Sequence, residues 1–145
     1  MCDASRRVHY AVGEDRERGG IWELTSEAHR ERWWPGVTLY DAIPLTCTPL
    51  QTILDKIGAG RSHFDLATID LEGGELPALL GIDFERVTFG VIVVEKNDDQ
   101  SINARIEDLL HSKGYAARHA EKQCSRRNVW FFHADFWRIY ERLLN

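Results

Sequence analysis

Apolar residues change their spacing several times along the chain, and each change predicts a different element. Val8 to Val12 alternate between apolar and polar positions, which is typical of a short strand. The stretch GGIWELTSE at 19–27 can pair with it as a second strand. From Ala28 to Pro44 no period is maintained, so we expect a loop in which Trp33, Trp34 and Pro35 pack as a cluster at the surface.

Four segments carry apolar residues at the spacing of three to four positions that is typical of a helix. Thr48, followed by Pro49, is the expected N-cap of the first segment, and Ser101 is the expected N-cap of the third. The second segment is short, because Pro77 is tolerated only in a first turn and Gly81 is a natural stop. We expect helices at about 48–57, 75–80, 101–113 and 135–144.

The second half of the chain also contains four strand-like segments. VTFGVIVVE at 87–95 is apolar almost throughout, which suits a strand covered on both faces. The others are expected at about 64–69, 115–119 and 128–133. Because strands and helices alternate, we predict a three-layer α/β fold with a mostly parallel sheet and an antiparallel pair at its C-terminal edge.

Composition narrows the classes of protein. With 145 residues, 43% hydrophobic and 28% charged, the chain fits one globular domain over residues 1–145. Its formal charge of −5 argues against a sequence-independent grip on nucleic acid, which depends on Lys and Arg. No apolar run approaches the roughly 20 residues that span a bilayer, and the N-terminus has no apolar signal core. We expect a soluble, cytoplasmic protein.

Several classes of site find no support in the sequence. Cys2, Cys47 and Cys124 are odd in number and far apart, so we expect neither a disulfide framework nor a thiolate zinc site, and a reducing compartment fits. The six histidines show no spacing of i, i+2 or i, i+4, which argues against a dedicated metal site. No Gly-x-Ser-x-Gly nucleophile elbow occurs, so the hydrolase interpretations fall away.

Acidic residues stand at the ends of two consecutive predicted strands. Asp70 comes directly after the strand at 64–69, and Glu95 ends the strand at 87–95. Ligands of open parallel sheets bind outside the carboxyl ends of the strands, so both acids are expected at such an edge. Asp70 could orient a substrate hydroxyl, accept its proton or ligate a divalent cation. Glu72 and Glu75 could instead cap the following helix and compensate its dipole.

The segment FDLATIDLEGGELPALLGIDFERV, at 64–87, carries a resemblance to a known family. Together with VIVVE, LLHSKGY and NVWFF further on, it resembles the FkbM-type methyltransferases, which are marked by an Asp-x-Glu-Gly-x-Glu-Leu turn before a Leu-x-Gly helix stop. The resemblance covers most of the chain, and its specific part is 70–80. The residues that match the turn one by one are Asp70, Glu72, Gly73, Glu75 and Leu76.

The resemblance implies a three-layer, Rossmann-like methyltransferase fold and S-adenosylmethionine as cofactor. It implies transfer of a methyl group to a hydroxyl of a small molecule or sugar, with Asp70 orienting the acceptor or binding a divalent cation, Glu72 supporting the turn and Glu95 lining the acceptor side. The adenine end of the cofactor is expected at Ala11 and Val12, with Asp70 also near the cofactor. No metal ligand set is implied.

The family's glycine-rich cofactor loop would lie before the part of the sequence that aligns, so we expect an N-terminally truncated chain. Without its neighbours, the strand at 8–12 should slide beside the strand at 64–69 or stay loosely attached. The open sheet edge would then allow two copies of the chain to pair. The alternative function is that of a truncated, non-catalytic remnant that acts as an interaction module.

Overall fold

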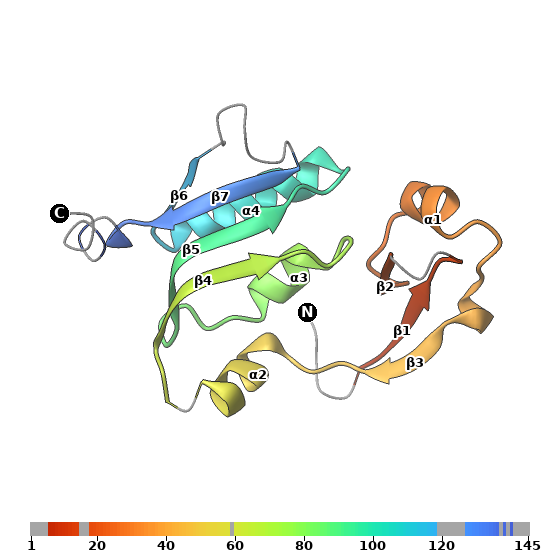
Figure 1. Ribbon diagram of the computed structural model, residues 1–145, viewed down its shortest axis with the longest axis horizontal. Coiled ribbons are helices and arrows are strands. Elements are labelled where there is room, and N and C mark those ends of the chain that lie inside the picture. Colours follow the sequence, from red (N-terminus) through yellow and green to blue (C-terminus); the bar gives the residue numbers. More distant parts are fainter. Residues whose placement is uncertain are drawn as a thin grey trace. The chain divides into compact units, whose positions relative to one another are not determined.

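The computed structural model describes residues 6–14, 18–58, 60–118, 127–136, 138 and 140. Within this part of the chain, two sheets and four α-helices form a mixed α/β structure (Figure 1). Contacts divide the chain into two compact units, which are residues 1–57 with 70–82 and residues 58–69 with 83–145. The mixed α/β class that the sequence predicts is confirmed.

The first unit contains a three-stranded antiparallel sheet with β1 at its centre. Tyr10 of β1 lies opposite Ile21 of one neighbour and Ile43 of the other. The strand predicted at 8–12 is confirmed, but its expected place beside 64–69 is wrong because both edges of β1 are paired within its own sheet. The alternative, that it stays loosely attached, remains a prediction. The strands are β1 (Arg7–Val12), β2 (Gly19–Ile21) and β3 (Ile43–Thr46).

Short helices complete the first unit, and part of it was expected to be a loop. The interval 28–44 contains most of α1, all of η1 and the start of β3, so the loop expectation is wrong. The seven residues of α1 make about two turns, too few for an apolar period to show. Its start is fixed locally, because the Ser26 side chain accepts a hydrogen bond from the His29 amide (3.1 Å). The helices are α1 (Glu27–Trp33), η1 (Leu39–Asp41), α2 (Leu50–Ile57) and α3 (Glu75–Leu80).

The aromatic cluster expected at the surface is present, but Trp34 lies in the core of the first unit, so the expected surface location is wrong for Trp34. Trp34 is 1% exposed and packs with Ala11 and Ala42. Its ring stacks on Trp22 with centroids 6.2 Å apart, and its Nε1 donates to the Arg18 carbonyl (3.0 Å). Because the indole N–H finds a partner, the buried ring contributes apolar burial without an unsatisfied donor.

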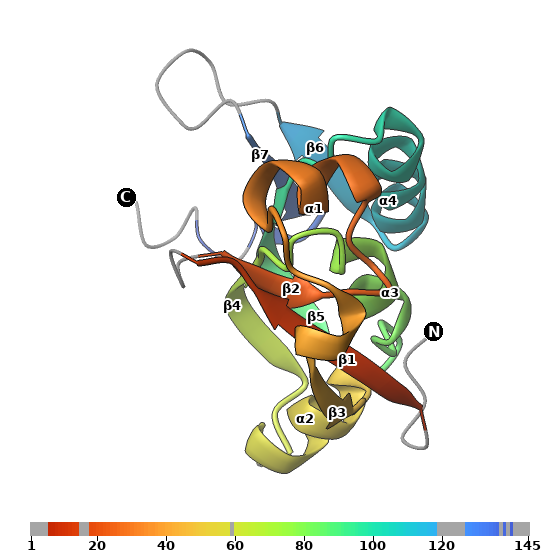
Figure 2. The same ribbon diagram turned by 90° about the vertical axis from the view of Figure 1, so that its right-hand side faces the viewer.

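The second unit is a four-stranded sheet in the order β4-β5-β7-β6, with α4 beside β6 (Figure 2). β5 is buried along almost its whole length, as its apolar sequence predicts. The strands predicted from residues 64, 87, 115 and 128 onward are all found. Their bounds are β4 (His63–Ile69), β5 (Thr88–Glu95), β6 (Tyr115–Arg118) and β7 (Asn128–His133), and those of the helix are α4 (Gln100–Ser112).

Strand direction in this sheet differs from the prediction in one respect. β4 and β5 are parallel, whereas β7 is antiparallel to both β5 and β6. β6 therefore runs in the same direction as β4 and β5, but β7 lies between them and makes two of the three pairings antiparallel. The antiparallel C-terminal pair is confirmed, and the mostly parallel sheet is not.

Side chains accept hydrogen bonds from backbone amides at the start of α4 and at the start of β5. The Asp99 side chain accepts from the Ser101 amide (2.8 Å), so Asp99 is the N-cap and the expectation of Ser101 is wrong. Asp and Ser are both good caps, and sequence alone does not separate neighbours of this kind. At the start of β5, the Phe89 amide donates to the buried Tyr115 hydroxyl (2.9 Å). Burial raises the pKa of Tyr115, and this hydrogen bond partly opposes the rise.

The cysteines and the last predicted helix are compared with the structure in turn. Cys47 is disulfide-bonded. The spacing of the cysteines predicted no disulfide framework, and this bond was not expected from it, because distance along the chain does not limit pairing in space. The helix expected at 135–144 lies largely outside the described residues. Each helix in the described part of the chain is too short or too polar to cross a membrane.

A hydrogen-bonded pair in the first unit makes stability depend on pH. Burial alone would raise the pKa of Glu23, but the His9 amide (3.0 Å) and His9 Nδ1 (2.6 Å) contact its carboxylate and hold the pKa below its ordinary value of 4.5. The stabilisation is therefore fully present above pH 4.5 and is lost as the pH falls through the lowered pKa. In urea unfolding, the advantage of the wild type over Glu23→Gln should disappear in acid, and a pH-independent difference would contradict this. Glu31→Gln, an exposed change, serves as the control.

Candidate functional site

The acidic turn, residues 70–74, follows β4 and is shaped by a buried carboxylate. Glu75 is the first residue of α3 and is 1% exposed. Its Oε1 accepts hydrogen bonds from the amides of Leu71 (2.9 Å) and Gly73 (3.1 Å), and its Oε2 accepts a second contact from Gly73 (3.1 Å). Glu75 therefore points back into the acidic turn and fixes its backbone, which is the capping role considered for it above.

Two residues of the acidic turn have left-handed backbone conformations. Gly73 has φ +107°, and a Cβ atom there would lie 2.7 Å from the Leu24 carbonyl oxygen. Only glycine fits this position. Glu72 has φ +52°, which costs about 1 kcal/mol or more for a residue with a side chain. Such an outlier points to a side chain whose position matters.

Thr25 ties the acidic turn to the segment between β2 and α1. The Thr25 side chain is almost fully buried, with 4% of the residue exposed. Its hydroxyl oxygen lies 2.9 Å from the Ile21 carbonyl and 3.2 Å from the Glu72 carbonyl. A carbonyl of the strained residue is thereby held by a group that is 47 positions away in the sequence.

The Glu72 side chain faces a histidine of α1. Its Oε2 lies 3.6 Å from His29 Nε2, and the two side chains are 27% and 12% exposed. His29 Nε2 is buried and has no hydrogen-bond partner among the described residues. The imidazole ring meets Trp34 edge-on, with centroids 5.6 Å apart. The imidazole ring therefore packs against Trp34, and the Glu72 carboxylate lies next to its Nε2.

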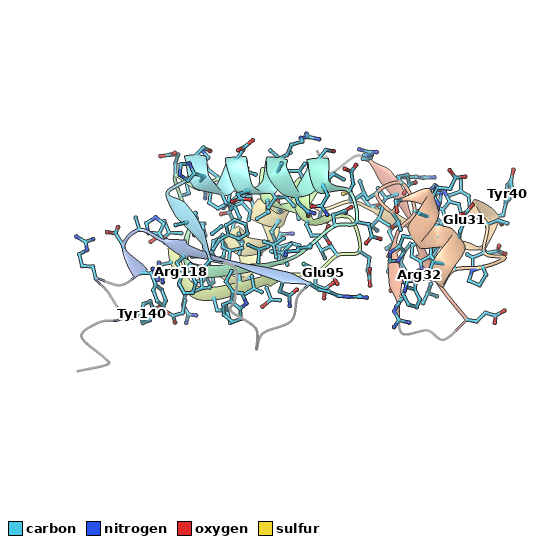
Figure 3. The ribbon with its side chains drawn as sticks, turned by 90° about the horizontal axis from the view of Figure 1, so that it is seen from above. Glu31, Arg32, Tyr40, Glu95, Arg118 and Tyr140 are labelled. Atoms are coloured by element: carbon cyan, nitrogen blue, oxygen red, sulfur yellow. The ribbon has the colours of Figure 1, made fainter. Side chains whose placement is uncertain are left out.

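Asp70 differs from Glu75 in being exposed. One of its carboxylate oxygens lies within 4.8 Å of one from Glu72, so the acidic turn carries two neighbouring acids at its surface. Asp70 is bonded to Ile69, which pairs in register with Val94. The residue after Val94 is Glu95, the half-buried last residue of β5 (Figure 3). Both strands thus end in an acid at the same edge of their sheet.

The two residues expected near the adenine are in β1. Ala11 is 2% exposed and belongs to the core around Trp34, so its side chain has no surface left for a ligand. Val12 is half-buried and pairs with Gly19 at the end of the strand. The expected adenine contact stays a prediction, and only Val12 offers side-chain surface for it.

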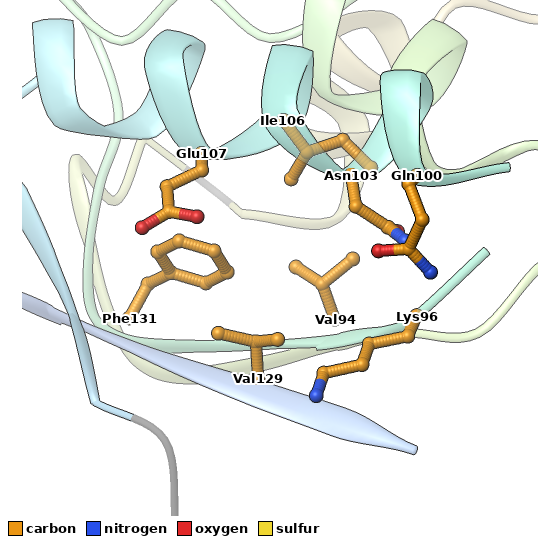
Figure 4. Close-up of a pocket in the computed structure, with 8 residues that line it drawn as sticks. All are labelled: Val94, Lys96, Gln100, Asn103, Ile106, Glu107, Val129 and Phe131. Carbon is orange, nitrogen blue, oxygen red and sulfur yellow. The ribbon is translucent and has the colours of Figure 1, made fainter.

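The second unit contains a small pocket of about 210 Å³ between α4 and the strands β5 and β7 (Figure 4). Its floor is apolar and its rim carries one cation, one carboxylate and two amides. The Asn103 amide is occupied by Asn97, with contacts of 2.7 and 2.8 Å. No residue predicted for the site lines it. The lining residues are Val94, Lys96, Gln100, Asn103, Ile106, Glu107, Val129 and Phe131.

A mixed α/β fold with an acidic, glycine-containing turn after a strand is consistent with a methyltransferase-like domain. The family described as the Methyltransferase FkbM domain matches residues 3–117. The chain therefore belongs to the FkbM methyltransferase family, and the resemblance drawn from the acidic turn is confirmed. Searches among curated proteins and among solved structures find no match.

Sequence reasoning missed two residues of this site, Thr25 and His29. Both lie in or next to the interval that was expected to be an irregular loop. The Ser26 N-cap, three residues before His29, was the available signal for a helix start. No local signal places His29 beside Glu72, because they meet only through the fold.

Proposed function

We propose that the protein transfers a methyl group from S-adenosylmethionine to a hydroxyl oxygen of a small molecule or sugar. Membership of the FkbM family supports methyl transfer. The observation that carries the proposal is that the acid that begins the acidic turn and the acid that follows it have different environments. Glu75 is buried and shapes the backbone, whereas Asp70 is left exposed on that rigid support. A carboxylate held in this way can orient an acceptor hydroxyl, and positioning is a large part of such catalysis.

The chemistry of the acidic turn fits the cofactor in part. S-adenosylmethionine carries an ammonium group and a sulfonium cation, and Asp70 with Glu72 offers two neighbouring carboxylates. The buried Ala11 side chain does not fit a role in adenine binding, so Val12 is the candidate of that pair. When bound, the cofactor supplies the methyl group, and the residues of this chain orient the acceptor and take up its proton.

In this proposal Asp70 accepts a hydrogen bond from the acceptor hydroxyl and fixes its direction. Glu72 stands next to it in the acidic turn. Glu95 would line the acceptor side, since β5 ends beside β4 at the edge where Asp70 leaves its strand. The parallel pair β4 and β5 is the part of the structure that supports a Rossmann-like origin for this edge.

Calorimetry with S-adenosylmethionine tests the proposal directly. We expect micromolar binding to the 145-residue chain, and transfer of a radiolabelled methyl group to at least one member of a panel of sugars and small hydroxylated molecules. S-adenosylhomocysteine should compete, because it shares every group except the transferred methyl. Binding that is absent or millimolar, with no labelled product, would reject catalysis by this chain.

A further inference from the structure

His29 and Glu72 form a carboxylate–imidazole pair that the proposed function has not yet used. Glu72 Oε2 lies 3.6 Å from His29 Nε2, and this nitrogen is sealed from solvent with no hydrogen-bond partner among the described residues. A buried polar nitrogen without a partner is costly and calls for an explanation. At 3.6 Å the contact is longer than an ordinary hydrogen bond.

The backbone supports the same pair from both sides. The backbone of Glu72 has a φ of +52°, a left-handed conformation that glycine would adopt at lower cost. The Thr25 hydroxyl holds its carbonyl. On the other side, the Ser26 side chain holds the His29 amide, and Trp34 packs edge-on against the imidazole. Two unrelated segments thus keep a base and an acid facing each other.

Other charged groups near the ring are already engaged. Arg30 donates to the carbonyls of Trp22 (2.8 Å) and Thr25 (2.6 Å) and lies over the Trp22 ring. Arg18 and Arg32 lie over the Trp33 ring, 3.9 and 4.6 Å from its centroid. Glu72 is therefore the acid in the described part of the first unit with an ion-pair contact to His29.

We propose that His29 is the proton acceptor of the reaction and that Glu72 is its positioning residue. This inference rests on the proposed function. Glu72 would hold the proton of Nε2, which leaves the lone pair of Nδ1 to accept the proton of the acceptor hydroxyl. The O–H bond breaks and its proton passes to Nδ1, while an electron pair of the oxygen forms the bond to the methyl carbon. The bond between that carbon and the sulfonium sulfur breaks at the same time, and S-adenosylhomocysteine is the leaving group. The Glu72 carboxylate stabilises the imidazolium that results.

Kinetics give the first arm of the test. His29→Gln should lower kcat about 10²-fold or more with little change in KM, because general-base catalysis typically contributes that much. In the wild type kcat should fall in acid, since a protonated imidazole cannot accept a proton, and His29→Gln should lose this fall. Added imidazole should restore part of the activity of His29→Ala. Unchanged turnover, or an unchanged acid limb, would overturn the proposal.

A matched control is available in the second unit. The Nε2 atom of His63 is also buried, has no hydrogen-bond partner in the part of the chain that the structure describes, and lies 3.9 Å from a carboxylate oxygen of Asp65. His63→Gln should leave the pH dependence of kcat unchanged. Glu72→Gln should lower kcat while the variant keeps its thermal midpoint within a few degrees, and imidazole should not rescue it.

The second arm is independent of catalysis and separates this inference from the proposed function. In ¹⁵N NMR of the full chain without ligand, neutral His29 should carry its proton on Nε2. In Glu72→Leu the same ring should populate both tautomers. If His29 carries its proton on Nδ1, the assignment is overturned even if methyl transfer is observed. If the wild type transfers no methyl group, the proposed function fails, and the role of His29 as proton acceptor is overturned with it. The tautomer then still shows whether Glu72 and His29 form a pair.

Discussion

Replacing Glu75 by alanine is expected to lower the free energy of unfolding by about 3 kcal/mol, because the amides of Leu71 and Gly73 lose their common acceptor. Glu75 is 1% exposed, so water cannot readily take the place of the carboxylate. The change also removes buried methylene groups. Urea unfolding followed by circular dichroism measures the effect, and the transition midpoint should fall without a large change in slope.

Two variants control this result. Glu75→Gln keeps the shape and one acceptor oxygen, so it should lose part of the stability that alanine loses. Glu85→Ala removes an exposed acid that stands 3.8 Å from Lys113, and it should change stability by less than about 0.5 kcal/mol. Equal stabilities of Glu75→Ala and the wild type would show that the acidic turn does not depend on the buried carboxylate.

Asp70→Asn is expected to lower methyl transfer about 10²-fold, with little effect on stability. Asparagine has the same size but no charge, so it orients a hydroxyl poorly and interacts weakly with a cationic cofactor. Asp70 is exposed, and folding should tolerate the change. The measurements are kcat and KM for the acceptor, together with a thermal midpoint.

Asp98→Asn is the matched control, since Asp98 is an exposed aspartate in the segment after β5. It should retain wild-type turnover. If Asp70→Asn also retains it, Asp70 has no part in the reaction. If Asp70→Asn instead unfolds the protein, the carboxylate is structural, and the distinction drawn between Asp70 and Glu75 is wrong.

Local patterns in the sequence predicted most elements of the fold. The uninterrupted apolar run of β5 and the glycine and proline limits of α3 gave these elements close to their observed bounds. The acidic turn carried the family resemblance, because its residues are set by the backbone itself. Residue 73 must be glycine because a Cβ atom there would lie too close to the Leu24 carbonyl oxygen, and the Glu75 carboxylate must accept from the Gly73 amide.

Long-range pairing could not be predicted in the same way. One of the two places expected for the strand at 8–12 was beside the strand at 64–69, but two short neighbours, β2 and β3, occupy both edges of β1. β2 lies within the segment 19–27 that was expected to pair with β1, and this pairing is confirmed, but the four residues of β3 carry too little periodicity to be recognised. His29 was missed because its proposed role depends on Glu72, which lies 43 positions further along the chain.

The acidic turn is separated in sequence from the rest of its unit by the segment 58–69. A backbone cut between α2 and β4 would therefore divide the first unit into two polypeptides, with His29 and Thr25 on one and Asp70 and Glu72 on the other. Neither piece would hold all the groups of the proposed reaction. Mixing the two pieces should regenerate function only as they reassociate, with a concentration dependence like that of a split enzyme.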